Sequence, residues 1–282
     1  MPSTAELTSL ASSHDIVTIG MMADEARRRR HGAVTTFVRV AEVAAEPGAP
    51  VVVPPAAGEV RIAGVPADSS AAAARIKEVV AASHSVPVSG FSLADLEQLA
   101  GRERVTLRAL LEQLRAAGLE LVAEAPFDQL RDRRRSIEEV NIAGLGLARL
   151  TIHQLPSSEV PELMNDVSML QQDVGVIRAF APLPRRVNAA VPTTGYDDVK
   201  RVALARLFVE NIPSIQVDWA LYGPKLAQVA LTVGANDVDG VSAADDAGTG
   251  PRRAPLEEIR RNIQAAGLEP VERDGRFDRR VR

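Results

Sequence analysis

The sequence predicts an α/β protein whose mostly parallel sheet is either open or closed into a barrel. Two observations support this prediction. Short apolar runs alternate with segments of helical periodicity along most of the 282 residues. Apolar residues make up 46% of the chain and charged residues 25%, a balance typical of a globular protein that buries a core.

Apolar runs bounded by glycine, proline or polar residues are expected to form the strands. They cover residues 34–40, 59–63, 86–90, 119–123, 149–153, 177–181 and 215–220. The clearest helix is expected at 105–117, where leucines recur at three- and four-residue steps before Gly118. We interpret this stripe and three similar ones as core rather than as cofactor sites: Leu107, Leu110, Leu111 and Leu114; Val199, Val202, Ala203 and Leu207; Leu226, Val229, Ala230 and Val233; Leu256, Ile259 and Ile263.

Residues 1–31 are expected to form a helical lead-in. The stretch ends in the arginine run 27–30, His31 and Gly32, which is typical of a helix end. A phosphate site is the alternative interpretation of the arginines, and we favour a solvated last turn.

The segment 41–58 interrupts the alternation of strands and helices. It holds Pro47, Pro50, Pro54 and Pro55, and prolines forbid a regular helix across most of its length. The first crossover between parallel strands is therefore expected to lack its helix, or to replace it with an extended connection.

Charge and cysteine content exclude several classes of protein. The formal net charge of −4 argues against a nucleic-acid-binding protein. No run of 18 apolar residues is present and the N-terminus does not resemble a signal peptide, so we expect a cytoplasmic protein without a membrane span. The absence of cysteine rules out thiolate catalysis and Cys-ligated zinc or iron–sulfur clusters within these residues. The four histidines lie far apart, so no metal site is expected.

Four residues are candidates for binding a ligand, and none is assigned a catalytic role. Asp95 and Glu124 lie near predicted strand ends, where a barrel places its site. Trp219 and Tyr222 close the apolar run that begins at residue 215. The alternative is structural: carboxylates near strand ends, including Asp128 and Asp218, often cap helices or face solvent, and a lone tryptophan is often core. The segment 234–240 lacks the first ligand of a calcium loop, so we interpret it as a turn.

An ordered series of motifs in the second half carries a resemblance to a known family. It comprises TTGYDD at 193–198, ALARL at 203–207, NIP at 211–213, Trp219, GPKLAQVAL at 223–231 and GANDVDG at 234–240. The series resembles the radical-SAM enzymes of futalosine-route menaquinone synthesis. This group includes aminofutalosine synthase and dehypoxanthine futalosine cyclase, and it is related to the deazaflavin-cofactor synthase. Residues 23–32 and 95–120 are also similar to the family, so the resemblance covers most of the chain.

The departures from the family pattern fall where the family performs its chemistry. The resemblance implies a CxxxCxxC loop after the first strand, whose four-iron cluster binds and cleaves SAM. Here that loop is the proline-rich 41–58 segment, without cysteine. The family's loops after strands four, five and six are replaced by AEAPFD at 123–128, QLPSS at 154–158 and PLPRR at 182–186. We therefore expect no cofactor: no iron–sulfur cluster and no SAM binding.

The resemblance implies a partial or distorted (β/α) TIM-like barrel of the radical-SAM type, with the first crossover helix missing. That side is expected to be open or covered by 41–58, with Val51–Val53 supplying the packing. We expect a single domain over 1–282: a helical lead-in at 1–31, the barrel core at 32–240, and a loop with the C-terminal helix at 241–282.

Two functions follow as hypotheses. The first is a catalytically inactive homologue that acts as a stabilising or regulatory partner of an active radical-SAM paralogue in menaquinone or quinone-related cofactor biosynthesis. It predicts a hetero-oligomer and an exposed apolar patch near the shortened first unit. The alternative is a nucleoside- or SAM-like-ligand-binding protein, or a non-radical enzyme, which uses the barrel mouth as a lone chain or homodimer. It predicts a pocket lined by Asp95, Glu124, Trp219 and Tyr222.

Overall fold

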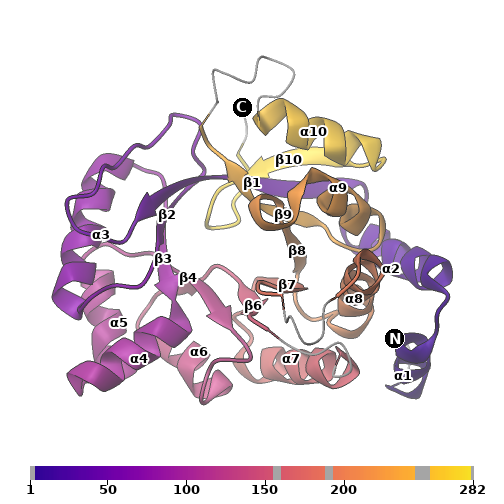
Figure 1. Cartoon of the computed structure of the whole chain (residues 1–282), viewed down its shortest axis with the longest axis horizontal. Helices are drawn as coiled ribbons and strands as arrows, with labels where there is room; N and C mark the ends of the chain where they lie inside the picture. Colours follow the sequence, from indigo (N-terminus) through magenta and orange to yellow (C-terminus); the bar gives the residue numbers. More distant parts are fainter. Residues whose placement is uncertain (1–3, 155–159, 188–192, 245–254, 281–282) are drawn as a thin grey trace.

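Parallel strands close into a barrel in the computed structural model, which describes residues 4–154, 160–187, 193–244 and 255–280 (Figure 1). Around the ring, the described strands follow in the order β1 (Val34–Ala44), β2 (Glu59–Ala63), β3 (Val88–Ser92), β4 (Leu121–Pro126), β6 (Leu150–Ile152), β7 (Ala179–Pro184), β8 (Ser214–Asp218) and β9 (Asp237–Ser242). Pairing of β9 with β1, with Asp237 opposite Thr36, closes the ring.

Two further strands extend this barrel. The short β5 (Gly146–Leu147) pairs with β4. Strand β10 (Glu269–Arg273) pairs in parallel with Val34–Val38 of β1, whereas β2 pairs with the later residues Val40–Ala44. The C-terminal segment therefore returns to the N-terminal end of the barrel.

Helices surround the strands as an outer layer (Figure 1). They are α3 (Ser69–Ser83), α4 (Leu93–Glu103), α5 (Leu107–Ala116), α6 (Arg133–Ile142), α7 (Val160–Val174), α8 (Gly195–Phe208), α9 (Trp219–Thr232) and α10 (Pro255–Ala265). The lead-in forms α1 (Thr4–Ser12) and α2 (Ile16–His31), and Ile19 and Ala23 of α2 pack against Ala203 and Leu207 of α8. None of the described helices has the length and apolarity needed to cross a membrane.

Side-chain caps explain where several helices begin. Asp68, Thr106, Asp132 and Asp218 each accept a backbone N–H from the first turn of the following helix. Thr194 and Asp197 form a reciprocal capping box at the start of α8.

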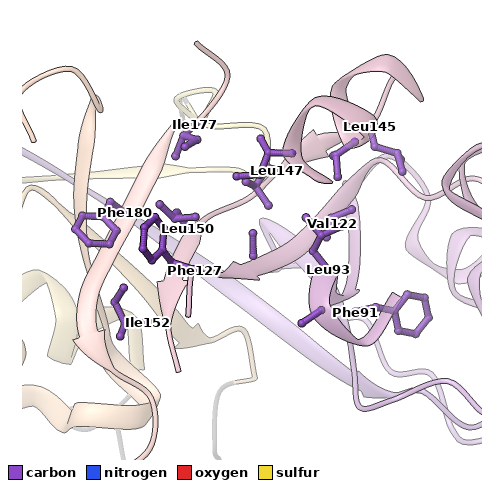
Figure 2. Packing of buried hydrophobic residues seen from close by; sticks show 14 of the residues in the cluster. Phe91, Leu93, Val122, Phe127, Leu145, Leu147, Leu150, Ile152, Ile177 and Phe180 are labelled. Carbon is purple, nitrogen blue, oxygen red and sulfur yellow. The ribbon is translucent and has the colours of Figure 1, made fainter. Parts of the chain in front are cut away.

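The main core lies between the strands and the helical layer. Leu110, Leu111 and Leu114 of α5 are buried, which confirms the clearest predicted stripe. Figure 2 shows buried apolar side chains of neighbouring strands and of the segments between them, which belong to one cluster; the labelled ones are Phe91, Leu93, Val122, Phe127, Leu145, Leu147, Leu150, Ile152, Ile177 and Phe180. This packing holds the strands whose ends form the barrel mouth.

The prediction of a (β/α) barrel without its first crossover helix is confirmed. No helix lies between β1 and β2, yet the barrel is closed. Arg75 of α3 donates to the carbonyl oxygens of Ala44 (2.7 Å) and Ala49 (2.8 Å), and Val51 and Val53 pack against the core. Hydrogen bonds from an arginine and apolar contacts thus order a segment that cannot form a helix.

Several predicted details were wrong. Residues 237–242 form the last barrel strand rather than a turn, and the expected strand at 215–220 ends at Asp218, where α9 begins. Val229 of the predicted stripe in α9 is exposed. Arg27 is fully buried against Asp24, so only the later arginines of the run form a solvated turn. The expected loop at 241–251 lies outside the described residues after position 244, as does the replaced turn after Gln154.

Candidate functional site at the barrel mouth

Charged side chains occupy the middle of the barrel, around Asp239 of β9. Its carboxylate, 1% exposed, accepts hydrogen bonds from Nη2 and Nη1 of Arg61 at 2.8 and 3.1 Å, and a third from Arg149. The Nε of Arg61 donates to Glu59 at 2.9 Å. Burial alone would raise the pKa of Asp239, but the charges of Arg149 and Arg61 hold it well below its ordinary value. The carboxylate is therefore ionised, and the two arginines balance its negative charge.

A second ion pair closes the N-terminal end of the barrel. Asp237 accepts hydrogen bonds from Nε and Nη2 of Arg273 at 2.6 and 2.7 Å, and from Gln216 at 2.7 Å. Phe277 lies under the guanidinium of Arg273, 3.9 Å from its Cζ to the ring centre. Because Arg273 belongs to β10, the C-terminal segment seals this end.

At the opposite end, where the strands terminate, Arg185 joins two carboxylates. Its Nε lies 3.2 Å from Oε2 of Glu124, and its Nη1 lies 3.2 Å from Oδ2 of Asp218. Glu124 also lies 4.0 Å from Arg149, which pairs with Asp239. A continuous series of ion pairs therefore connects Asp239 with the mouth. Burial lowers the pKa of Arg185, but Glu124 and Asp218 raise it by more, so the guanidinium stays charged.

The structure brings three of the four candidate residues into this region. Glu124 is in the ion network, and Asp95, in the first turn of α4, has its pKa raised by burial and by the charge of Glu124. Tyr222 donates its hydroxyl to the carbonyl oxygen of Pro184 at 2.6 Å, and burial raises its pKa. Trp219 begins α9 and packs against the main core, as the structural alternative expected. Ligand binding by these four residues stays a prediction.

The arginines of the network were missed at the level of sequence. Arg61, Arg149 and Arg185 each pair with a carboxylate from another part of the chain. A signal was present in the short strands: charges alternate with apolar residues at Glu59 and Arg61, and again at Asp237 and Asp239. Alternating charge in a strand whose other face is core indicates a charged barrel interior.

A cavity of about 370 Å³ opens at the mouth beside the ends of β1 and β9. Val40 and Glu42 of β1 line one side and Ser242 of β9 another. Val52 and Pro54 of the proline-rich connection form a further wall. The proline-rich connection therefore shapes the space at the mouth.

The donor set at this place does not fit a four-iron cluster. Such clusters are held by thiolates, and the connection after β1 offers only the carboxylate of Glu46 as an ionisable group, beside Glu42 near the end of the strand. Across the described ranges, no group of three or more histidine, cysteine, aspartate or glutamate side chains is placed to hold a metal ion.

Comparison with known proteins agrees with this barrel. Residues 179–282 match the family described as the CofH/MqnC C-terminal region. The aminodeoxyfutalosine synthase of Thermus thermophilus is 30% identical over 223 residues, which are 68% of this chain and 60% of that enzyme. The chain thus resembles the CofH/MqnC enzymes but contains no cysteine. This confirms the resemblance inferred from the motifs.

Further relatives match shorter or more divergent stretches. The cyclic dehypoxanthine futalosine synthase of Streptomyces coelicolor is 24% identical over 220 residues, covering 69% of this chain and 55% of that enzyme. The 5-amino-6-(D-ribitylamino)uracil–L-tyrosine 4-hydroxyphenyl transferase of Archaeoglobus fulgidus is 36% identical over 121 residues, covering 38% of this chain and 35% of that enzyme. The chain thus spans at most about three fifths of the length of these relatives.

Solved structures share the fold at low sequence identity. Methylornithine synthase superposes with a TM-score of 0.68 at 11% identity, covering 95% of this chain and 94% of that one. The FeFe-hydrogenase maturase HydG from Carboxydothermus hydrogenoformans gives 0.63 at 12% identity, covering 96% and 76%. At these identities the likeness establishes the barrel fold alone.

Proposed function

We propose that this CofH/MqnC relative is a catalytically inactive partner that stabilises or regulates an active, cysteine-bearing radical-SAM paralogue in menaquinone or quinone-related cofactor biosynthesis. The observation that carries the proposal is the pairing of the barrel's carboxylates with arginines, beside a connection after β1 that has no thiolate. We expect neither an iron–sulfur cluster nor SAM to be a cofactor of this chain.

The ion network supports a structural role for the barrel interior. Glu124, Asp218 and Asp239 each lie within 3.2 Å of a guanidinium nitrogen. A paired, ionised carboxylate is a weak proton acceptor, because protonation would leave the arginine uncompensated in a buried site. We therefore expect these three carboxylates to stabilise the barrel rather than to act as acids or bases.

Exposed valines near the shortened unit support a binding surface for a partner. Val52 of the proline-rich connection is 71% exposed, and Val65, which follows β2, is 60% exposed. Gly64 lies against Ala45, so the segments that follow β1 and β2 run close together here. Exposed apolar side chains that gather in one place are typical of sites that a protein partner covers.

Purification of the tagged protein from its own host, followed by native mass spectrometry, tests the proposal. We expect a discrete complex with a cysteine-bearing relative, which is lost in the double variant Val52→Glu, Val65→Glu. The matched control is Val17→Glu on α2, because Val17 is 67% exposed and lies outside the mouth. A bare chain or homodimer in all three samples contradicts the proposal.

The mouth cavity favours a second candidate, a small-molecule-binding protein that acts without a radical-SAM partner. The cavity of about 370 Å³ is large enough for a small ligand. Such a ligand could bind there without an iron–sulfur cluster. In the same experiment, a lone chain or homodimer that carries the extra mass of a nucleoside or SAM-like compound supports this candidate over the first.

A further inference from the structure

Arg201 of α8 is a buried cation that has no partner among the described residues. It is 1% exposed, and its Nε, Nη1 and Nη2 all lack a hydrogen bond. Burial lowers the pKa of Arg201, against the opposing charges of Asp198 and Asp197. A guanidinium carries five N–H donors, and leaving them unpaired in a buried place is costly.

The other fully buried arginines of the described chain differ from Arg201 in this respect. Arg27 and Arg75, for example, bond a carboxylate and a backbone carbonyl each, and Arg273 bonds Asp237. Arg206 bonds the carbonyl oxygen of Gly234. The unmet donors of Arg201 therefore point to an acceptor that is not part of the described chain.

Arg201 lines a cavity of about 320 Å³ between α1, α7 and α8. Most of the remaining wall is apolar and comes from Ala11, Val160, Pro161 and Leu204. The cavity lies outside the strand barrel, on the side of the lead-in helices, and is separate from the mouth cavity.

The other charged groups of this wall already have partners. Lys200 donates its Nζ to the carbonyl oxygen of Ser13 at 2.6 Å. Asp197 accepts hydrogen bonds from the backbone N–H and the hydroxyl of Thr194 at 2.9 and 2.8 Å. Arg201 is therefore the group of this wall that is left to recognise a ligand.

We infer that this cavity binds a small organic carboxylate, with Arg201 holding its two oxygens and the apolar walls holding its body. The planar guanidinium matches a carboxylate through two parallel N–H···O bonds. Apolar walls favour a ligand with a hydrocarbon part over a fully hydrated inorganic anion. The inference rests on α8 and its neighbours and is independent of the proposed partner function.

Isothermal titration at constant ionic strength tests the site with hexanoate as the probe. Hexanamide has the same shape without the charge, and inorganic phosphate has charge without an apolar body. We expect saturable hexanoate binding in about the millimolar range, with hexanamide and phosphate each about tenfold weaker or more. Equal binding of hexanamide, equal binding of phosphate, or no saturable binding of hexanoate overturns the inference.

Variants locate the binding within the cavity. Arg201→Gln is expected to weaken hexanoate binding at least about tenfold, whereas Arg261→Gln, at an exposed position of α10, leaves it unchanged. Ala11→Phe, on α1, should fill the cavity while Arg201 stays in place, which keeps the test valid where Arg201→Gln does not fold. Native affinity in Ala11→Phe, or in a folded Arg201→Gln, contradicts the assignment.

Discussion

Replacing Asp239 with asparagine removes the carboxylate that holds the barrel interior together. Arg61 and Arg149, 5% and 3% exposed, then stay buried with less compensation. Arg61 keeps Glu59, but Arg149 keeps only Glu124 at 4.0 Å. Breaking a buried pair on one side costs about 3–5 kcal/mol. With about 2.1 cal/mol/K of unfolding entropy per residue over 282 residues, Tm is expected to fall by about 5–8 °C.

Calorimetry at pH 7 measures this change. The matched control is Glu138→Gln, which removes an exposed ion pair with Arg134 on α6 and is expected to cost below about 1 kcal/mol. Because the folded pKa of Asp239 is lowered, its contribution is complete above the unfolded value near pH 4 and is lost only below it. A Tm for Asp239→Asn within about 2 °C of the control refutes the account of the interior.

Three further changes probe other parts of the fold. Burial and the charges of Arg206 and Arg30 lower the pKa of His31 to about 4, so its contribution to stability is complete above about pH 6.5 and is lost toward pH 4. The fall of Tm between pH 7 and pH 5 should therefore be smaller in His31→Gln than in the exposed control His14→Gln. An equal fall of Tm in the two variants contradicts this prediction. Leu111→Ala opens a cavity under α5 and should lower the free energy of unfolding by about 2–5 kcal/mol in urea titrations, against less than about 1.5 kcal/mol for Leu111→Met. Gly234→Ala should lower Tm measurably, because the residue has a φ of 117° and a Cβ there would lie 2.8 Å from Cβ of Arg206. An unchanged Tm would show that α8 and this turn can move apart without a loss of stability.

The fold could be predicted largely from local patterns in the sequence. Leucine spacing identified α5, and the prolines of 41–58 identified the missing crossover helix, because both effects act between neighbouring residues. The boundary between β8 and α9 was misplaced because the apolar run crosses it, and the mark of the boundary is the single cap Asp218.

The charged interior could not be predicted in the same way. Asn236, Asp237 and Asp239 suggested a turn, because Asn and Asp side chains favour turns. Arg273 lies 36 positions from Asp237, whereas Arg149 and Arg61 lie 90 and 178 positions from Asp239. Only the closed barrel brings these partners together. Arg201 is similar: its lack of a partner among the described residues is a property of the packed helices and leaves no mark in the sequence.

We expect this chain to hold no iron–sulfur cluster and to cleave no SAM, and anaerobic iron–sulfur reconstitution tests this expectation most directly. Iron and acid-labile sulfide are measured per chain, beside a cysteine-bearing relative treated in the same way, and SAM is then added to both with a reductant. We predict a stoichiometric cluster and 5′-deoxyadenosine from the relative, and neither from this chain. A stoichiometric cluster that cleaves SAM in this chain would contradict the account.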